Sequence, residues 1–349
     1  MAKKEWEKEL SEYIIQGEPS KKEKAENWET AIGLQEVDGL KTSDYLIDTA
    51  KDHIEGKIDI YEAKNRISEY YEEKNTTSDD DIEEADKVAV RITELLGEKT
   101  FSFSTAELLN IHKRLFEGII DKAGVYRDFD FSKKEWILNN DTVVYSPYEI
   151  IEEALEYDFK EERYFSYKGL TIDESIERLC RFVSNIWQVH PFVEGNTRTT
   201  AVFLIKYLRT FGFDLDNEIF KDNSWYFRNA LVRANYTNIS KGIYEDLSYL
   251  EKFFYNMLAN KNYELKNRYL HIDYKDDLND QKENNNLSLE EQAILNIIKS
   301  NPSITQSEIA SRIDKSIRTV KTYMQEMQDK KIIARQNSKK TGEWVILDK

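Results

Sequence analysis

Two strongly apolar stretches with helical spacing enclose a short polar segment of this chain. Upstream, residues 176–187 place apolar side chains three and four positions apart, on one face of a helix. Downstream, residues 201–208 are apolar nearly all round, which is typical of a buried helix. Polar groups between two buried helices need partners or a function, because an unpaired buried polar group is costly. The fold must therefore place the polar segment His190–Arg198 where its side chains are used.

This segment holds a base, an acid, a glycine, an amide and an arginine within nine residues. His190 is the side chain whose ordinary pKa suits a general base near neutral pH. Gly195 and Asn196 can adopt backbone conformations that most residues avoid, and amides opening the next helix would point at a phosphate. Arg198 can pair with phosphate oxygens, and a Glu194 carboxylate beside phosphates implies a bridging Mg²⁺. The pattern indicates an anion site beside a proton transfer; the alternative is a core histidine with a surface Glu–Arg pair.

The run His-Pro-Phe-Val-Glu-Gly-Asn-Thr-Arg resembles the signature of Fic-domain proteins, His-x-Phe-x-Asp/Glu-Gly-Asn-x-Arg-x-x-Arg. Members of that family transfer AMP from ATP to a hydroxyl side chain of a target protein. The resemblance implies that His190 deprotonates the hydroxyl, that Glu194 holds Mg²⁺, and that Phe192 pins the loop into the core. The implied nucleotide- and phosphate-binding residues are Glu194, Gly195, Asn196, Thr197 and Arg198.

The segment departs from the family pattern at two positions. Thr197 stands where Gly or Lys is usual, and Ala201 stands where the second arginine belongs. In the family, that arginine helps to hold the terminal phosphate of ATP in the productive pose. Relatives with altered motifs use other nucleotides or transfer other groups, so ATP is the expected co-substrate and another nucleotide the alternative.

Composition predicts a mainly α-helical chain. Its 349 residues include only 4 Pro and 12 Gly, with much Leu, Ile, Glu and Lys. The single Cys180 lies on an apolar helix face, so an internal disulfide is excluded and a reducing cytoplasm is expected. The 4 His residues are scattered, which offers no His/Cys metal cluster. No stretch has the length of a membrane span, and the start lacks the apolar core of a signal peptide, so we expect no membrane contact.

Shifts in composition divide the chain into parts. We expect N-terminal regulatory helices over 1–78, a Fic-type helical core over 79–275, a charged linker over 276–286 and a C-terminal domain over 287–349.

The N-terminal helices resemble the inhibitory helices of the same family, whose motif is Ser/Thr-x-x-x-Glu-Gly/Asn. Their glutamate pairs with the second arginine of the signature. In the matching window, Gly39 agrees, Asp38 is one methylene shorter than Glu, and Leu34 replaces the hydroxyl residue. Asp38 and Gly39 are therefore the candidate regulatory residues. Because Ala201 removes the arginine, we expect that inhibition by this salt bridge does not operate; the alternative is an ordinary helical subdomain.

β-Branched and aromatic residues on both sides of Asn139-Asn140-Asp141 predict a hairpin over residues 125–145. One interpretation is an isolated hairpin packed on helices. The resemblance implies a flap over the active site that aligns a target protein by strand pairing, a mode that makes little demand on sequence. We therefore expect the target protein to dock on this hairpin.

The C-terminal segment has the pattern of a winged helix-turn-helix. Three helical stretches are followed by a hairpin wing, and residues 287–349 carry 11 Lys or Arg against 8 Asp or Glu, a net charge of +3. The rest of the chain is strongly acidic, since the whole has a net charge of −16. If this module reads DNA, the candidate contacts are Arg318, Lys321, Lys339 and Lys340. The alternative is a winged helix used for protein contact.

Together these patterns predict a mainly α protein with N-terminal helices, a helical core with a hairpin flap, and a C-terminal winged helix. The predicted function is Mg²⁺-dependent transfer of AMP, or of another nucleotide-derived group, to a protein hydroxyl, which is protein adenylyltransferase activity. The alternative is a DNA-bound transcriptional regulator whose core binds nucleotide but has little catalytic activity.

Overall fold

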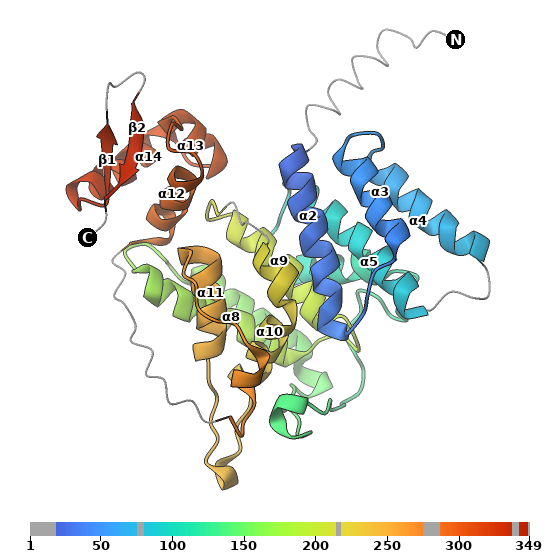
Figure 1. Cartoon of the computed structure of the whole chain (residues 1–349). Helices are drawn as coiled ribbons and strands as arrows, with labels where there is room; N and C mark the ends of the chain where they lie inside the picture. The colour runs from blue at the N-terminus through green and yellow to red at the C-terminus, as the bar shows by residue number, and fades with distance from the viewer. Residues whose placement is uncertain (1–18, 75–79, 214–217, 275–286, 337–341, 348–349) are drawn as a thin grey trace, which may run out of the picture. The chain divides into compact units, whose positions relative to one another are not determined.

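The structure is a computed structural model, and it describes residues 19–74, 80–213, 218–274, 287–336 and 342–347. Within these ranges the chain is mainly α-helical and has one short two-stranded sheet (Figure 1). The mainly α class predicted from composition is confirmed. The chain forms two compact units, one of Met1–Thr100 with Phe220–Asp222 and one of Phe101–Ile219 with Asn223–Lys349. The expected linker over 276–286 lies outside the described residues.

The first unit contains the N-terminal helices. Its elements are α2 (Lys21–Gly33), η1 (Leu34–Asp38), α3 (Asp44–Ile54), α4 (Ile60–Lys74) and α5 (Asp80–Gly97). The carboxylate of Asp86 on α5 organises its interior, because it accepts hydrogen bonds from the Ser43 amide at 2.9 Å and the Tyr71 hydroxyl at 2.7 Å. The sequence places a domain boundary at residue 78, just before α5. Because α5 packs against α2 and α4, the compact unit instead extends to Thr100.

The second unit contains the helical core. Its helical elements are α6 (Thr105–Phe116), η2 (Trp136–Leu138), η3 (Tyr148–Ile150), α7 (Ile151–Tyr164), α8 (Ile172–Val189), α9 (Asn196–Arg209), most of α10 (Glu218–Ala234), η4 (Ile239–Lys241), α11 (Ser248–Ala259) and η5 (Asn267–Leu270). Helix α9 is buried from residue 196 to residue 208, which includes the apolar stretch 201–208 predicted to be buried and the polar residues that precede it. Aromatic rings fill the space beside it; Phe103 lies 4.6 Å from Tyr207 and 5.1 Å from Phe159 between ring centroids.

The flap segment, defined here as residues 125–146, reverses direction through η2. Asn139 and Asn140 have φ of 56° and 64°, so the turn falls where the sequence predicts it. The arms differ from the expected hairpin, because their one β contact is an isolated bridge between Glu135 and Asp141. Side chains donate hydrogen bonds to backbone carbonyls of the arms in place of strand pairing. Arg127 donates to the carbonyls of Phe129 and Ser146, and a glutamine of α8 donates to the carbonyl of residue 144.

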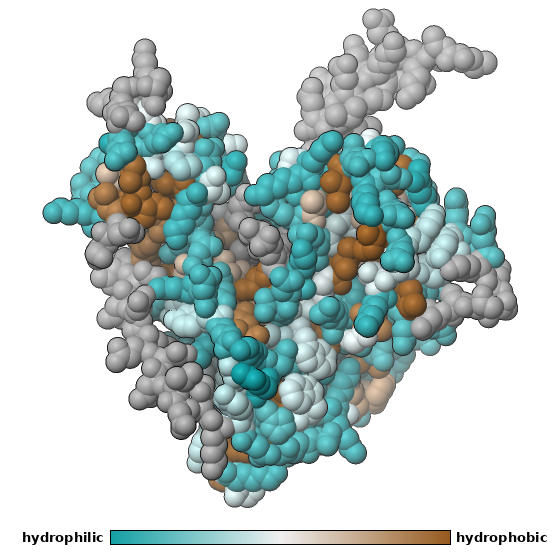
Figure 2. Space-filling model, in the orientation of Figure 1, coloured by the Kyte–Doolittle hydropathy of each residue, from teal (hydrophilic) through white to brown (hydrophobic). Residues whose placement is uncertain are grey.

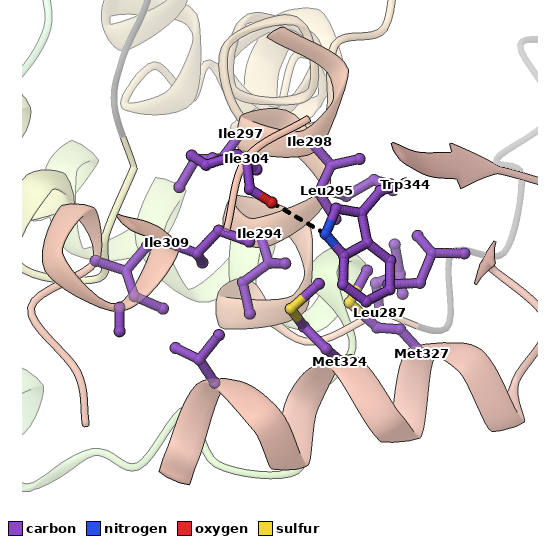
Figure 3. Close-up of a cluster of buried hydrophobic side chains, with 14 residues drawn as sticks. Leu287, Ile294, Leu295, Ile297, Ile298, Ile304, Ile309, Met324, Met327 and Trp344 are labelled. Atoms are coloured by element: carbon purple, nitrogen blue, oxygen red, sulfur yellow. Dashed lines mark hydrogen bonds between the residues drawn. The ribbon is translucent and has the colours of Figure 1, made fainter. Parts of the chain in front are cut away.

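The C-terminal part folds as the predicted winged helix. It contains α12 (Leu289–Ser300), α13 (Gln306–Arg312), α14 (Ile317–Asp329), β1 (Ile333–Gln336) and β2 (Glu343–Ile346). The antiparallel strands pair Ile333 with Ile346. Trp344 of β2 enters the apolar core with Met324 and Met327 of α14, and its Nε1 donates to the carbonyl of Ile304 at 3.1 Å (Figure 3). The wing is thus attached by a buried indole, and its strands carry a hydrophobic patch on the face seen in Figure 2.

The winged helix packs on the helical core within the second unit. On α12, the Asn296 amide donates to the carbonyl of Leu258 at 2.9 Å and accepts from Asn260 at 2.7 Å. Gly212 follows α9 with φ of 87°, and a Cβ there would lie 2.4 Å from the Cβ of Ile313. Position 212 therefore requires glycine for both its backbone conformation and the close approach of Ile313.

Candidate active site

His190 ends helix α8 in the left-handed region, with φ of 50° and ψ of 58°. Its Nδ1 lies 3.3 Å from the carbonyl oxygen of Trp187. Because a carbonyl only accepts hydrogen bonds, Nδ1 carries the proton and Nε2 carries the lone pair. The His190 side chain is buried, and its Nε2 has no hydrogen-bond partner in the part of the chain that the structure describes. The imidazole is therefore in the tautomer that a general base needs.

Burial holds the pKa of His190 well below its ordinary value of 6.5. The positive charges of Lys133, Arg228 and Arg127 lower the pKa further, and the Trp187 carbonyl opposes them. The ring is consequently neutral at physiological pH, so it can take up a proton during a reaction.

Aromatic rings surround the imidazole. Tyr145 stacks on it with ring centroids 3.9 Å apart and planes 15° apart. Phe131 and Trp187 meet it edge-on at 5.6 Å and 5.2 Å. Tyr145 and Phe131 both belong to the flap segment, so in this conformation the flap closes His190 Nε2 from solvent. A target hydroxyl reaches that nitrogen only after part of the flap moves.

The loop after His190 is held by an amide and by a second histidine. The Asn196 side chain accepts from the Phe192 amide at 3.0 Å and donates to the Phe192 carbonyl at 2.7 Å. The Phe192 ring stacks on His112 of α6 at 3.6 Å. His112 Nδ1 accepts from the Gly124 amide at 2.8 Å, so its Nε2 carries the proton and donates to the Glu194 carbonyl at 3.1 Å.

His112 was not singled out from the sequence. It lies on the apolar face of an amphipathic helix, where a lone histidine gives no spacing signal. Burial lowers the pKa of His112 to about 4. It is therefore neutral, and both of its nitrogens are used in holding the loop.

The start of α9 has the properties expected of an anion site. Its N-cap is Gly195, with φ of 73° and no side-chain cap, so the first-turn amides have no intrahelical acceptor. A Cβ at residue 195 would lie 2.3 Å from the Phe116 ring, which excludes a larger residue. The buried Arg198 guanidinium lies 4.8 Å from the centroid of the same ring. Backbone amides and an arginine thus lie together at the positive end of a helix dipole.

The structure gives two predicted phosphate-binding residues a different role for their side chains. The Asn196 amide is occupied by the loop backbone, and the Thr197 hydroxyl accepts from Trp187 Nε1 at 3.0 Å. Both side chains therefore support the fold, and only their backbone amides are available to a ligand at the helix start.

Glu194 is the exposed carboxylate of this loop, while its carbonyl is held by His112. No group of three or more His, Cys, Asp or Glu side chains that could hold a metal ion occurs in the described ranges. A magnesium ion bound to phosphates needs only one or two protein carboxylates and keeps several waters. A single exposed glutamate beside an anion site fits that requirement.

Arg127 joins the flap segment to the loop and was missed by sequence reasoning. Its buried guanidinium donates to the carbonyls of His190 at 2.8 Å and Val189 at 3.3 Å, and to the carbonyls of Phe129 and Ser146. Its amide also donates to the carbonyl of residue 191 at 2.8 Å. The sequence feature that could have indicated its role is its position within a run of aromatic residues, because a buried guanidinium needs several hydrogen-bond acceptors.

A buried ion pair lies on the flap. Glu135, which is 1% exposed, accepts from both terminal nitrogens of Arg228 on α10, at 2.8 Å and 3.0 Å. The Tyr236 hydroxyl also donates to Asp141 at 2.7 Å. The sequence offered no means to pair these distant residues, and the pairing fixes the flap to α10.

The candidate regulatory residues lie at the end of η1 in the N-terminal unit. Asp38 is the last residue of η1, and Gly39 caps it in the left-handed region with φ of 75°. Ala201, the position of the missing second arginine, is fully buried on α9. The regulatory role of Asp38 and Gly39 stays a prediction.

The candidate DNA contacts lie on the third helix of the winged domain. Arg318 and Lys321 are exposed on α14, where a shallow hollow of about 520 Å³ is also lined by Thr322, Gln325 and Glu326. Lys339 and Lys340 lie outside the described residues. Among the described helices, none has the length and apolar character needed to cross a bilayer.

Two parts of the chain are similar to known protein families. Residues 102–208 match the Fic/DOC family, and residues 291–334 match a winged helix-turn-helix DNA-binding family. No match was found among curated proteins. A solved structure of a Fic family protein from Desulfovibrio desulfuricans G20 is similar over 93% of this chain and 88% of that one, with 12% identity and a TM-score of 0.41.

Proposed function

Because the chain carries a Fic/DOC family domain over residues 102–208, we propose that it transfers AMP, or another nucleoside monophosphate, to a hydroxyl of a target protein or of itself. The observation that most supports this is the state of His190. Its Nε2 holds a lone pair, is buried, and has no partner among the described residues. A domain that only bound nucleotide would have no need for such a nitrogen.

In the proposed step, the target hydroxyl oxygen attacks the α-phosphorus while His190 Nε2 takes its proton. The new P–O bond forms as the bond from α-phosphorus to the bridging β-oxygen breaks. Pyrophosphate leaves with that electron pair, and the target gains a nucleotide in phosphodiester linkage. The imidazolium then returns its proton to solvent.

The phosphates would bind at the start of α9. The backbone amides of residues 196–198 and the Arg198 guanidinium supply donors there, and the helix dipole favours negative charge. Mg²⁺, held by Glu194 and phosphate oxygens, would neutralise phosphate charge when bound. Ala201 offers no cation to the terminal phosphate, so we expect weaker discrimination between nucleoside triphosphates and diphosphates than a second arginine would give.

The test of the base is His190→Ala in the full chain. The wild type, incubated with Mg²⁺ and each of four ribonucleoside triphosphates, should gain one nucleoside monophosphate or modify proteins of a cell lysate, as read by mass spectrometry. His190→Ala should lose transfer by about 10²–10⁴-fold while calorimetry shows unchanged nucleotide affinity. His271→Ala, a histidine whose ring contacts Trp136 and not the imidazole of His190, is the matched control. A folded His190→Ala variant with the wild-type rate would remove this residue from the mechanism.

The metal assignment has a separate test. Glu194→Ala should weaken nucleotide binding only when Mg²⁺ is present, since the amides and Arg198 bind without metal. Calorimetry with Mg²⁺ and with EDTA separates the two cases. Equal affinities of variant and wild type for Mg-nucleotide would show that Glu194 does not hold the metal.

The winged helix favours a second candidate function, that of a DNA-bound regulator that senses nucleotide. Here the core would bind nucleotide without transfer, and DNA affinity would change with nucleotide. A fluorescence-anisotropy titration of duplex DNA with and without ATP tests this. Nucleotide-dependent DNA binding by a wild type that transfers nothing would favour the regulator over the enzyme.

A further inference from the structure

Two buried polar atoms that lie in one pair of stacked rings have no hydrogen-bond partner among the described residues. One is Nε2 of His190, and the other is the hydroxyl oxygen of Tyr145. The two rings that carry them are stacked, so the two atoms lie within one aromatic pair. Buried tyrosine hydroxyls usually find a partner, because leaving one unpaired costs free energy. The Tyr145 hydroxyl therefore needs an explanation that packing does not give.

The neighbours of Tyr145 do not explain its hydroxyl. The negative charge of Glu135 acts on Tyr145, but both oxygens of the Glu135 carboxylate accept hydrogen bonds from Arg228. Arg127, the other charged neighbour, is a donor that is used by backbone carbonyls. Phe131 contacts the same imidazole with no hydroxyl at all. A phenylalanine at position 145 would fill the same space without the cost of an unpaired polar atom.

The protonation state of the Tyr145 hydroxyl indicates which substrate atom it can bind. Burial raises the pKa of Tyr145 well above its ordinary value, so the phenol stays protonated and can donate. A donor on the attacking target oxygen would weaken that nucleophile. A donor on the phosphoryl group instead stabilises the negative charge that develops there in the transition state.

We infer that the Tyr145 hydroxyl is a catalytic group that donates a hydrogen bond to a non-bridging oxygen of the phosphoryl group being transferred. The inference rests on the proposed function and adds to it a residue on the flap. The flap thereby contributes directly to the reacting centre once it closes over bound nucleotide. In the reacting complex, the flap has moved enough to admit the target hydroxyl to His190 Nε2, and the Tyr145 hydroxyl donates to the phosphoryl group.

Tyr145→Phe in the full chain is the test, because it removes only the hydroxyl. We expect kcat to fall roughly 10-fold or more with little change in KM, since the hydrogen bond forms in the transition state. The urea midpoint should stay equal or rise, because an unpaired buried hydroxyl has been removed. Tyr148→Phe, an exposed tyrosine three residues further along, is the matched control and should change neither quantity.

The outcomes separate this inference from the function on which it rests. Unchanged kcat in Tyr145→Phe, with an active wild type, overturns the role of the hydroxyl and leaves the proposed transferase intact. A loss of kcat together with a lower urea midpoint also overturns it, because the hydroxyl would then be structural. A wild type that transfers no group from any of the four nucleotides overturns the proposed function and this inference together.

Discussion

Replacing Arg127 should release the flap from the loop that carries His190. The Arg127 guanidinium donates to four backbone carbonyls and to the Asp130 carboxylate at 3.0 Å. Arg127→Met keeps the length of the side chain but removes every donor. The carbonyls of Val189 and His190 would then be buried without that donor.

The loss in the free energy of unfolding can be estimated from these two buried carbonyls. Each buried acceptor left unpaired costs about 1–3 kcal/mol, and the other three lie partly exposed, where water can replace the arginine. The Asp130 carboxylate is 61% exposed, so losing its partner leaves no buried charge, and the two unpaired buried carbonyls together cost about 2–6 kcal/mol. We therefore expect Arg127→Met to lower the free energy of unfolding by about 2–6 kcal/mol. Arg127→Lys keeps the charge but has only three donors at one atom, so its loss should be smaller.

Urea unfolding followed by tryptophan fluorescence measures the effect, since Trp187 adjoins the site. Arg181→Met is the matched control, because Arg181 forms an exposed pair with Glu177 worth under about 0.5 kcal/mol. Diethyl pyrocarbonate should also modify His190 faster in Arg127→Met, as the flap no longer closes over it. A urea midpoint for Arg127→Met equal to that of the control would refute the clamp, and unchanged modification would refute its effect on the flap.

Three further predictions concern other parts of the molecule. Burial lowers the pKa of His112 from 6.5 to about 4, so the unfolded chain takes up its proton first. The stability contributed by neutral His112 is therefore full above pH 6.5 and is lost by about pH 4, and the loss is on the order of 3 kcal/mol. A urea midpoint that stays constant between these pH values would contradict this prediction. Gly195→Ala should destabilise more than Gly242→Ala, because both have positive φ but only residue 195 faces a ring; equal midpoints would count against this. Lys321→Ala should lower the salt slope of DNA binding by about one unit, and Arg318→Ala should reduce sequence preference, as anisotropy titrations would show.

Most of the fold could be predicted from the spacing of apolar residues along the sequence. Helices α8 and α9 follow from apolar spacing, because a buried face must recur every three or four residues whatever surrounds it. The winged helix follows for the same reason, with turn residues marking its wing. The flap differs from the expected hairpin since strand-like residues do not reveal that side chains will take the backbone carbonyls.

The sequence points to the candidate motif but not to the residues that hold the motif in place. His190, Glu194 and Arg198 stand close together in the sequence, so their spacing alone suggests shared chemistry. His112 and Arg127 come from separate segments and act through contacts with backbone atoms. Such contacts leave no periodic trace in a single sequence, so the residues that hold the loop could not be found from it.

Helix α9 serves two tasks at its two ends. Its first turn forms the candidate phosphate site, and Gly212, just beyond its last turn, lies under Ile313 of the winged helix. At 1.5 Å per residue, the two ends of this 14-residue helix are about 21 Å apart. Any ligand that shifts the helix along its axis therefore acts on both ends, and thermodynamic linkage makes the effect mutual. A tenfold change in nucleotide affinity caused by DNA requires a tenfold change in DNA affinity caused by nucleotide.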